Sequence, residues 1–343
     1  MELRNINISE RMEHYNVSGL SIAFIENGMI HMTKEFGVMK AGTTRNVDSQ
    51  SIFNACSISK FLTATLVLKL TDQGILHLDE DINNRLISWK VPENEYTQNK
   101  KVTLRTLLSH QSGVIDPEGS FNELNSILGN PTMAELLEGR TPYCQERIEV
   151  KYEPESDFQY SDAGFCIIQQ LIEDVCGKPF ELLMDELIFE PLHMKNSTFK
   201  QTTLTERSGL FSCGHNKKGE VVSSKYPIYP YPAASGLWTT PTDLAILLIE
   251  VINALKGKSK IGLSESKAKE LITSQGCKEW AGLAVFLDGS GQGIEFSSLG
   301  WGIGFQCMLV AYPYLETGVV IMTNTDLGVH QMKGIIGEII HRI

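Results

Sequence analysis

The chain has 343 residues, of which 42% are hydrophobic and 21% charged, a composition typical of globular proteins and unlike disordered, collagen-like or fibrous ones. Lys and Arg number 30 and Asp and Glu 41, so the formal net charge of -11 argues against a general nucleic-acid or anionic-membrane surface. No apolar run reaches the roughly 18 residues of a membrane span. The first residues lack the pattern of a secretory leader, so we expect a cytoplasmic protein, or a secreted one if a leader has been removed.

The first segments predict a helix followed by a hairpin. Residues 2–16 are compatible with a short amphipathic helix. Strand-like runs over 20–25 and 29–32 predict two strands, and Asn27 and Gly28 between them accept the positive φ angles of a tight turn.

The middle of the chain, from residue 57 to about 200, has mostly helical patterns. Leucines that recur every four residues after residue 61 predict a helix that ends at Gly74. A second helix is predicted to begin with Asp162 as its cap and to end at Gly177.

Strand patterns return near the C-terminus. Four strands are predicted over 283–287, 294–297, 307–311 and 319–322, followed by a helix whose apolar side chains run from Met332 to Ile340. The glycine-rich residues 289–293 link two strands, so they predict a turn and not a phosphate-binding loop.

Strands at both ends with helices between them predict an α+β fold. We expect one antiparallel sheet flanked by N- and C-terminal helices, with an inserted, mostly helical domain. The predicted division is residues 1–56 and 235–343 for the sheet domain and 57–234 for the helical domain, with an active site in the cleft between them.

Cysteine usage predicts neither disulfides nor a metal site. The seven cysteines are scattered, without a Cys-x-x-Cys pair, unlike a disulfide framework. Cys213 and His215 are close in sequence, but no second pair of ligands lies at a useful spacing. We therefore expect no metal and no organic cofactor.

Ser57 and Lys60 form the first chemical pattern. Residues three apart share a helix face, so the two side chains can meet at the first turn of the predicted helix. A serine hydroxyl is a weak nucleophile until a base takes its proton, and a lysine is such a base only if its pKa is lowered. The spacing also fits Ser57 as a plain helix cap, and the polar stretch around Ser264 and Lys267 shows the same pattern.

Two further segments add to this pattern. Tyr160 directly precedes the second predicted helix, where its phenol could relay a proton; the alternative is a half-buried tyrosine before an Asp cap. The glycine-rich segment 298–305 ends a predicted strand, where glycines let a substrate backbone approach; the alternative is a bend or bulge.

Together these segments resemble the penicillin-recognising serine hydrolases, in the branch of class C β-lactamases, D,D-carboxypeptidase-like penicillin-binding proteins and related esterases. The resemblance spans almost the whole chain and implies a β-lactamase/transpeptidase-like fold. The segments that carry it, in order, are Phe53–Phe61, Leu107–Gly113, Tyr160–Asp162, Pro191–Met194 and Ala234–Leu244.

The resemblance also implies roles for single residues. Ser57 would be the acylated nucleophile, and Lys60 and Tyr160 the partners in proton transfer. The backbone N–H groups of Ser57 and Trp301 would form the oxyanion hole, and Gly300 would be the glycine of the family's Lys/His-x-Gly motif. His110, although in a matched segment, is read as a structural hydrogen-bonding residue.

Two positions depart from the family pattern. Ser298 stands where a Lys or His normally helps to hold a substrate carboxylate, and serine has no positive charge. Asp162 replaces the usual Asn and, if ionised, would favour the charged form of Lys60. Both changes make the site more negative, so we expect uncharged esters or amides to be handled better than substrates with a free carboxylate.

The resulting hypothesis is a serine hydrolase that acts through an acyl-enzyme on a small ester, amide or peptide. One alternative is β-lactamase or D,D-carboxypeptidase activity. Another is a non-catalytic binding or sensor protein on the same scaffold, which the two departures favour. A third is an unrelated α+β protein with chance motifs. No nucleic-acid partner is expected, and the sequence leaves the oligomeric state open.

Overall fold

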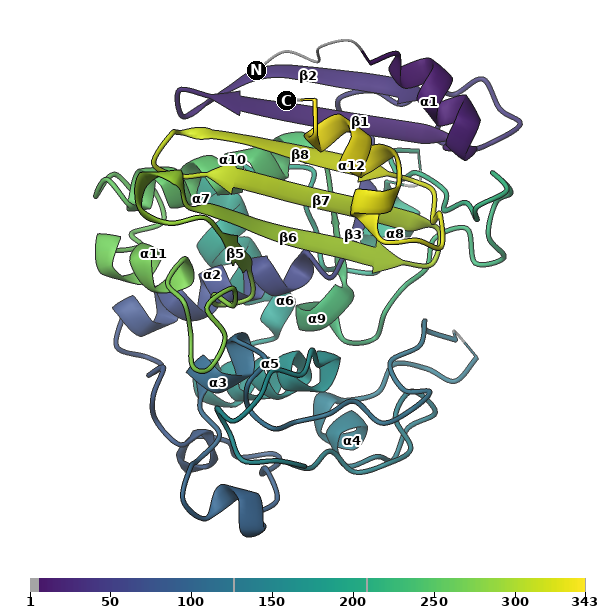
Figure 1. Cartoon of the computed structure of the whole chain (residues 1–343). Coiled ribbons are helices and arrows are strands. Elements are labelled where there is room, and N and C mark those ends of the chain that lie inside the picture. The colour runs from purple at the N-terminus through teal and green to yellow at the C-terminus, as the bar shows by residue number, and fades with distance from the viewer. Residues whose placement is uncertain (1–5, 126, 208, 343) are drawn as a thin grey trace.

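The computed structural model describes residues 6–125, 127–207 and 209–342. Within them, both ends of the chain build one antiparallel six-stranded sheet in the order β2-β1-β8-β7-β6-β5 (Figure 1). The N-terminal hairpin lies beside the C-terminal strand. The strands are β1 Gly19–Glu26, β2 Met29–Gly37, β5 Phe286–Asp288, β6 Glu295–Gly302, β7 Phe305–Tyr312 and β8 Thr317–Thr323.

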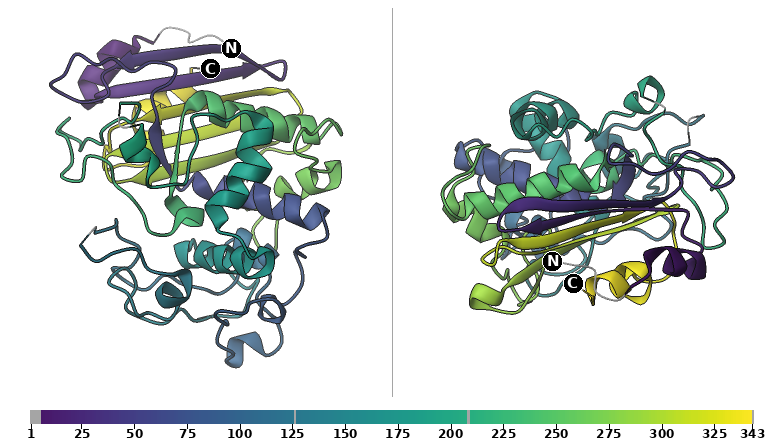
Figure 2. Two further views of the ribbon diagram at one scale, coloured as in Figure 1. Left: turned by 180° about the vertical axis from the view of Figure 1, so that it is seen from behind. Right: turned by 90° about the horizontal axis from the view of Figure 1, so that it is seen from above.

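Helices cover both faces of this sheet (Figure 2). Helix α10, Pro241–Ala254, packs on β1 and β8 from one side, while α1, Ile8–Tyr15, and α12, Ile335–Ile340, lie on the other. Alternate residues of β1 therefore enter different cores: Ile22 packs with α1 and α12, and Ala23 belongs to the main core. Coverage of both faces explains why this strand is apolar on both sides, apart from the buried Ser21.

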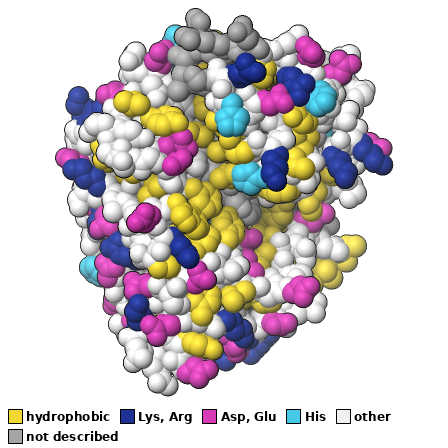
Figure 3. Space-filling view, viewed as in Figure 1, with side chains coloured by type: hydrophobic (Ala, Val, Ile, Leu, Met, Phe, Trp, Pro, Cys, Tyr) yellow, Lys and Arg dark blue, Asp and Glu magenta, His cyan; other side chains and the backbone are white. Residues whose placement is uncertain are grey.

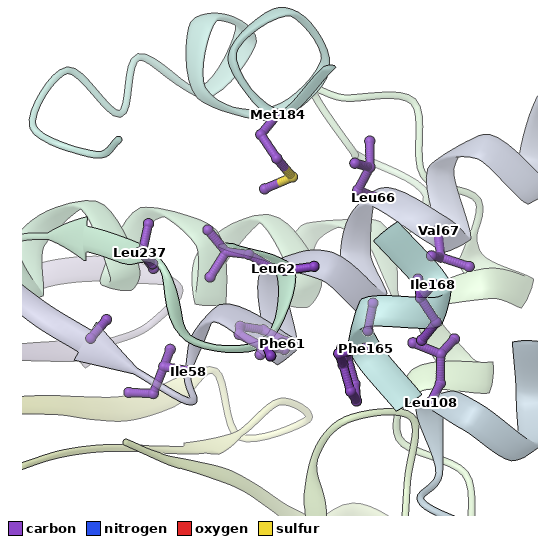
Figure 4. Close-up of a cluster of buried hydrophobic side chains, with 14 of the residues drawn as sticks. Ile58, Phe61, Leu62, Leu66, Val67, Leu108, Phe165, Ile168, Met184 and Leu237 are labelled. Atoms are coloured by element: carbon purple, nitrogen blue, oxygen red, sulfur yellow. The ribbon is translucent and has the colours of Figure 1, made fainter. Parts of the chain in front are cut away.

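Helix α2, Ser59–Asp72, is buried along most of its length and packs against α5, Asp162–Cys176. Figure 4 shows Phe61 and Leu62 of α2 in the same apolar cluster as Phe165 and Ile168 of α5. The other α-helices are α3 Leu104–Leu108, α4 Met133–Leu137, α6 Phe180–Met184, α7 Glu190–Leu192, α8 Thr203–Glu206, α9 Pro232–Ser235 and α11 Glu265–Leu271.

The α+β architecture with an antiparallel sheet from both termini is confirmed. The turn is also as expected, with φ of 52° at Asn27 and 67° at Gly28. Residues 2–5 of the first predicted helix lie outside the described residues. None of the helices in the part of the chain that the structure describes is both long and apolar enough to cross a membrane.

Several helix boundaries differ from the prediction. Helix α2 begins at Ser59, so Ser57 precedes the helix and does not cap it. The cap of α5 is Ser161, whose side chain accepts a hydrogen bond from Gly164 N, and Asp162 is the first helical residue. The last helix begins only at Ile335, because extended backbone at Gly334 separates it from the short turn that contains Met332.

Two strand predictions need correction as well. Strand β5 begins at Phe286 and not at residue 283, since Ala284 has a left-handed backbone with φ of 60°. A small second sheet was missed: β3, Phe53–Cys56, pairs with β4, Leu237–Thr239, apart from the main sheet. This small sheet leads the chain directly to Ser57.

Candidate active site

A tight turn between β3 and α2 presents Ser57. The preceding residue, Cys56, has a φ of 48°, a conformation that non-glycine residues adopt rarely. Its backbone N–H donates to Asn54 Oδ1 at 2.8 Å, and its carbonyl accepts from Ser59 Oγ at 2.6 Å. Ser59 Oγ in turn accepts from Leu237 N at 3.0 Å. These bonds hold the turn to both small-sheet strands and fix the position of Ser57.

Lys60 lies in the first turn of α2 with 2% of its surface exposed. Its Nζ donates to Ser57 Oγ at 3.2 Å and to the Ala234 carbonyl at 3.0 Å. The same Nζ forms an ion pair with Asp162 Oδ1 at 2.6 Å. The sequence-predicted pair therefore meets, although Ser57 lies just outside the helix.

The charge state of Lys60 follows from two opposing effects. Burial lowers the pKa of its ammonium group, but the negative charge of Asp162 and the interaction with Tyr160 together outweigh burial. The net pKa lies above the usual range of lysine. Lys60 is therefore an ammonium ion at neutral pH.

Tyr160 lies beside this pair, two residues before the start of α5. Its ring lies 4.8 Å from Lys60 Nζ and stacks on His110 with 4.3 Å between ring centroids. Burial raises the pKa of the Tyr160 hydroxyl, while the charge of Lys60 and hydrogen bonding toward Lys60 and Ser57 pull the pKa down. The net direction is upward, so Tyr160 is a neutral phenol at pH 7.

His110 and Asp116 position the segment that carries Tyr160 and Asp162. His110 Nδ1 accepts from Ser161 N at 3.1 Å, and burial together with the charge of Lys60 holds the pKa of the imidazole well below its usual value. Asp116 accepts from Ser161 Oγ at 2.7 Å, Asp162 N at 2.8 Å and Ala163 N at 2.9 Å. Sequence reasoning missed Asp116, because no local spacing links it to residues some 45 positions later.

Strand β6 supplies the opposite wall. Ser298 is buried and lines the cavity, and Trp301, 45% exposed, lines it too and donates from Nε1 to Asp326 Oδ1 at 2.8 Å. Gly300 does not line the cavity. A β-carbon there would lie 2.1 Å from the Ala55 carbonyl oxygen, so Gly300 instead lets β6 pack closely on β3.

A cavity of about 520 Å³ opens over these groups. Figure 3 shows apolar side chains gathered around a hollow in the middle of this face. Among the described residues that line it, the charged side chains are Lys60 and Asp162, which pair with each other, and two histidines, His110 and His330, line it as well. A second cavity, of about 450 Å³, shares Ser57, Asp162 and Trp301, so the candidate nucleophile has concave space on both sides.

Cys213 and His215 do not form a metal site. His215 Nε2 accepts from Ala41 N at 2.9 Å and Nδ1 lies 2.7 Å from the Asn324 carbonyl, so both ring nitrogens are already engaged. In residues 6–125, 127–207 and 209–342, no group of three or more His, Cys, Asp or Glu side chains could hold a metal ion.

Comparison with known proteins gives both sequence relatives and structural neighbours. The chain is 24% identical over 238 residues to "Protein flp" of Staphylococcus aureus (strain N315), which covers 68% of this chain and 44% of that protein. It is 29% identical over 217 residues to "Penicillin-binding protein 4" of Amycolatopsis lactamdurans, covering 63% of this chain and 52% of that protein. The chain thus spans about half the length of the curated relatives it matches.

The solved D-amino acid amidase from Ochrobactrum anthropi SV3, in complex with L-phenylalanine amide, has a similar fold. The TM-score is 0.78 at 21% identity, over 98% of this chain and 94% of that one. At this identity the likeness shows the fold alone. The family model described as "Beta-lactamase" matches residues 5–336, nearly the whole chain, and the protein therefore belongs to the β-lactamase family of serine hydrolases and penicillin-binding proteins.

Proposed function

We propose that this protein is an enzyme that forms an acyl-enzyme on Ser57 and hydrolyses small esters or amides that lack a free carboxylate. The observation that supports this most directly is the contact of Lys60 Nζ with Ser57 Oγ at 3.2 Å beneath a cavity. Tyr160 beside the pair provides the third group of the proposed proton relay. The proposed catalytic cleft lies between the sheet domain, 1–56 and 235–343, and the helical domain, 57–234.

The proposed first step is attack of Ser57 Oγ on the substrate carbonyl carbon. Since Lys60 is an ammonium ion at rest, it must first lose a proton to solvent, a loss that the negative charge of Asp162, 2.6 Å away, opposes. The neutral amine then takes the Ser57 proton as the C–O bond forms. The backbone N–H groups of Ser57 and Trp301 are proposed to stabilise the oxyanion.

The tetrahedral intermediate then loses its leaving group. Tyr160 gives its proton to the departing oxygen or nitrogen and regains one from Lys60. In the second half-reaction, water gives a proton to neutral Lys60 as its oxygen attacks the carbonyl carbon of the Ser57 ester. The bond from that carbon to Ser57 Oγ then breaks, the acid leaves, and Lys60 returns the proton to Oγ. Proton transfer among Ser57, Lys60 and Tyr160 thus serves both acylation and deacylation.

The proposed substrate class follows from the charges around the cavity. Ser298, which the sequence resemblance aligns with the family's cation, lines the cavity, and Lys60 is already paired with Asp162. A substrate carboxylate would therefore lack an unpaired lysine or arginine to bind, which favours esters and amides without a free carboxylate. The structural likeness to the D-amino acid amidase from Ochrobactrum anthropi SV3 supports an amide as a candidate substrate.

β-Lactamase or D,D-carboxypeptidase activity is the second candidate. Family membership and the relative named a penicillin-binding protein favour it. A non-catalytic binding protein is a weaker candidate, because such a protein would not need Ser57, Lys60 and Tyr160 together in one cavity.

Steady-state rates on a neutral p-nitrophenyl ester, an amino acid amide and benzylpenicillin test the proposal. We expect turnover of the ester or amide with a larger kcat/KM than penicillin, and loss of turnover in Ser57→Ala. Ser264→Ala is the matched control, since Ser264 has the same Ser-x-x-Lys spacing but caps α11 on the surface. Turnover that survives Ser57→Ala would overturn the proposed nucleophile.

A further inference from the structure

The second cavity beside Ser57 is lined mostly by residues that do not line the first cavity. Its volume is about 450 Å³, and it extends from Ser57 toward Phe121, Glu123, Tyr229 and Tyr231. Because Ser57 lines both cavities, a group bound here would belong to the same molecule whose carbonyl reaches Ser57.

Glu123 is the unusual group in this cavity. Its Oε2 atom is enclosed, and no hydrogen-bonding partner for it occurs among the described residues. Buried polar atoms in folded proteins nearly always have a partner, and an unpaired carboxylate oxygen is costly to enclose. Glu123 thus lines a cavity next to the nucleophile with a carboxylate that the described residues leave incompletely paired, which indicates a ligand that supplies a donor.

The surroundings indicate the charge of that ligand. Among the described residues that line this cavity there is no Lys, Arg or His, and the other carboxylate, Asp162, is already paired with Lys60. The rings of Phe121, Tyr229 and Trp301 provide aromatic surface, which favours a cation over an anion or a neutral polar group.

We propose that this cavity binds a primary ammonium group of the substrate, with Glu123 as its counter-ion. The inference rests on the proposed function and narrows its substrate class to esters or amides of amino acids with a free amine. The carboxylate of Glu123 accepts hydrogen bonds from the ammonium, while the acyl carbon reaches Ser57. Glu123 is then a specificity-determining residue and takes no part in proton transfer.

The test compares alanine p-nitroanilide with its N-acetyl derivative, which has the same acyl chain and leaving group but no ammonium. In the unaltered protein we expect a clear preference for the free amine. In Glu123→Gln, the ratio of the two kcat/KM values should fall roughly 10- to 100-fold, as expected for loss of a hydrogen bond between charged groups. Glu118→Gln is the control, because Glu118 is exposed on the same loop and does not line the cavity.

An unchanged ratio in Glu123→Gln, with alanine p-nitroanilide turned over, would overturn the inference. Binding of alaninamide to Ser57→Ala protein by calorimetry decides it without catalysis: we expect binding that weakens at least tenfold when Glu123→Gln is added. Equal binding by the single and the double variant would also overturn it. If neither anilide nor any ester is turned over, the proposed function fails, while the calorimetric comparison still decides the role of Glu123.

Discussion

At the scale of single residues, the ion pair of Lys60 and Asp162 controls the proposed chemistry. Lys60 Nζ and Asp162 Oδ1 lie 2.6 Å apart. The negative charge of Asp162, together with Tyr160, raises the pKa of Lys60, although burial alone would lower it. A base must be unprotonated before it can accept a proton, so the proposed relay works only in the fraction of molecules in which Lys60 is neutral.

Asp162→Asn should shift the pH profile toward acid. The neutral amide removes the charge that raises the pKa of Lys60, so the pKa falls and the rising limb of kcat/KM moves to lower pH, by about one unit or more. The rate at pH 7 should rise about tenfold in consequence. The measurement is the pH dependence of ester hydrolysis; a limb that stays in place or moves to higher pH would contradict the proposed base.

Ser298→Lys should change which substrate is preferred. A lysine at this buried position of the cavity wall restores the charge that holds a carboxylate, so penicillin acylation should improve about tenfold relative to a neutral ester. Stopped-flow or mass measurements of acylation give the ratio. Ser290→Lys adds the same charge at an exposed position outside this cavity and should leave the ratio unchanged. If the ratio were also unchanged in Ser298→Lys, Ser298 would not occupy the position that binds a substrate carboxylate.

Sequence reasoning located some of these residues and missed others for a physical reason. Ser57 and Lys60 are three residues apart, so local helix geometry alone brings them together. Asp116 and Glu123 act on the site from a loop, and only tertiary folding places Asp116 under the start of α5. The periodicity of the sequence does not identify a residue whose partners are distant in the chain.

At the scale of elements, the close packing of β6 on β3 positions the nucleophile. A β-carbon on Gly300 would lie 2.1 Å from the Ala55 carbonyl oxygen and 2.4 Å from Cys307 Sγ. Strand β3 continues into the turn that presents Ser57, so any displacement of β3 also displaces the candidate nucleophile.

Gly300→Ala should therefore lower both stability and activity. Overpacking of this kind costs about 1–3 kcal/mol, and we expect the loss of kcat/KM to be larger than the loss of folded protein explains. Thermal unfolding and ester hydrolysis measure the two effects. Gly293→Ala is the matched control, since its β-carbon would meet nothing within 4 Å. If Gly300→Ala and Gly293→Ala had the same thermal stability and the same rate of ester hydrolysis, the site would tolerate displacement of β3.

The main sheet was predictable because β1, β7 and β8 are mostly apolar and the hairpin turn has a clear signal at Asn27 and Gly28. The small sheet was not, because β4 has only the three residues Leu237–Thr239 and shows no alternation to detect. The start of β5 was misplaced for a related reason: the left-handed Ala284 interrupts an apolar run that reads as continuous strand.

At the scale of the whole molecule, the two ends of the chain close the fold. Arg11 of α1 donates two hydrogen bonds to Glu338 of α12, at 2.6 Å and 2.7 Å, and Tyr15 donates a third at 2.8 Å. These helices cover the sheet face opposite α10, so the bonds fasten the N-terminal hairpin to the C-terminal strands.

Glu338→Gln should lower the Tm by roughly 1–3 °C at pH 7, because partly exposed ion pairs contribute little. The hydrogen bond from Arg11 lowers the folded-state pKa of Glu338. The stability that ionised Glu338 contributes is therefore fully present above its unfolded-state pKa of about 4.3. It is lost as the pH falls through the lower folded-state pKa. The difference in Tm from the unaltered protein should shrink below about pH 4. Glu13→Gln on α1 is the control; a difference that grows in acid would contradict the assigned pairing.

The most direct test of the central claim is the intact mass of the protein after treatment with a serine-directed fluorophosphonate. We expect one adduct per chain, located on Ser57 by peptide mapping, with none in Ser57→Ala and an unchanged yield in Ser264→Ala. An adduct that persists in Ser57→Ala, or a fully folded protein that takes up none, would contradict a nucleophilic Ser57.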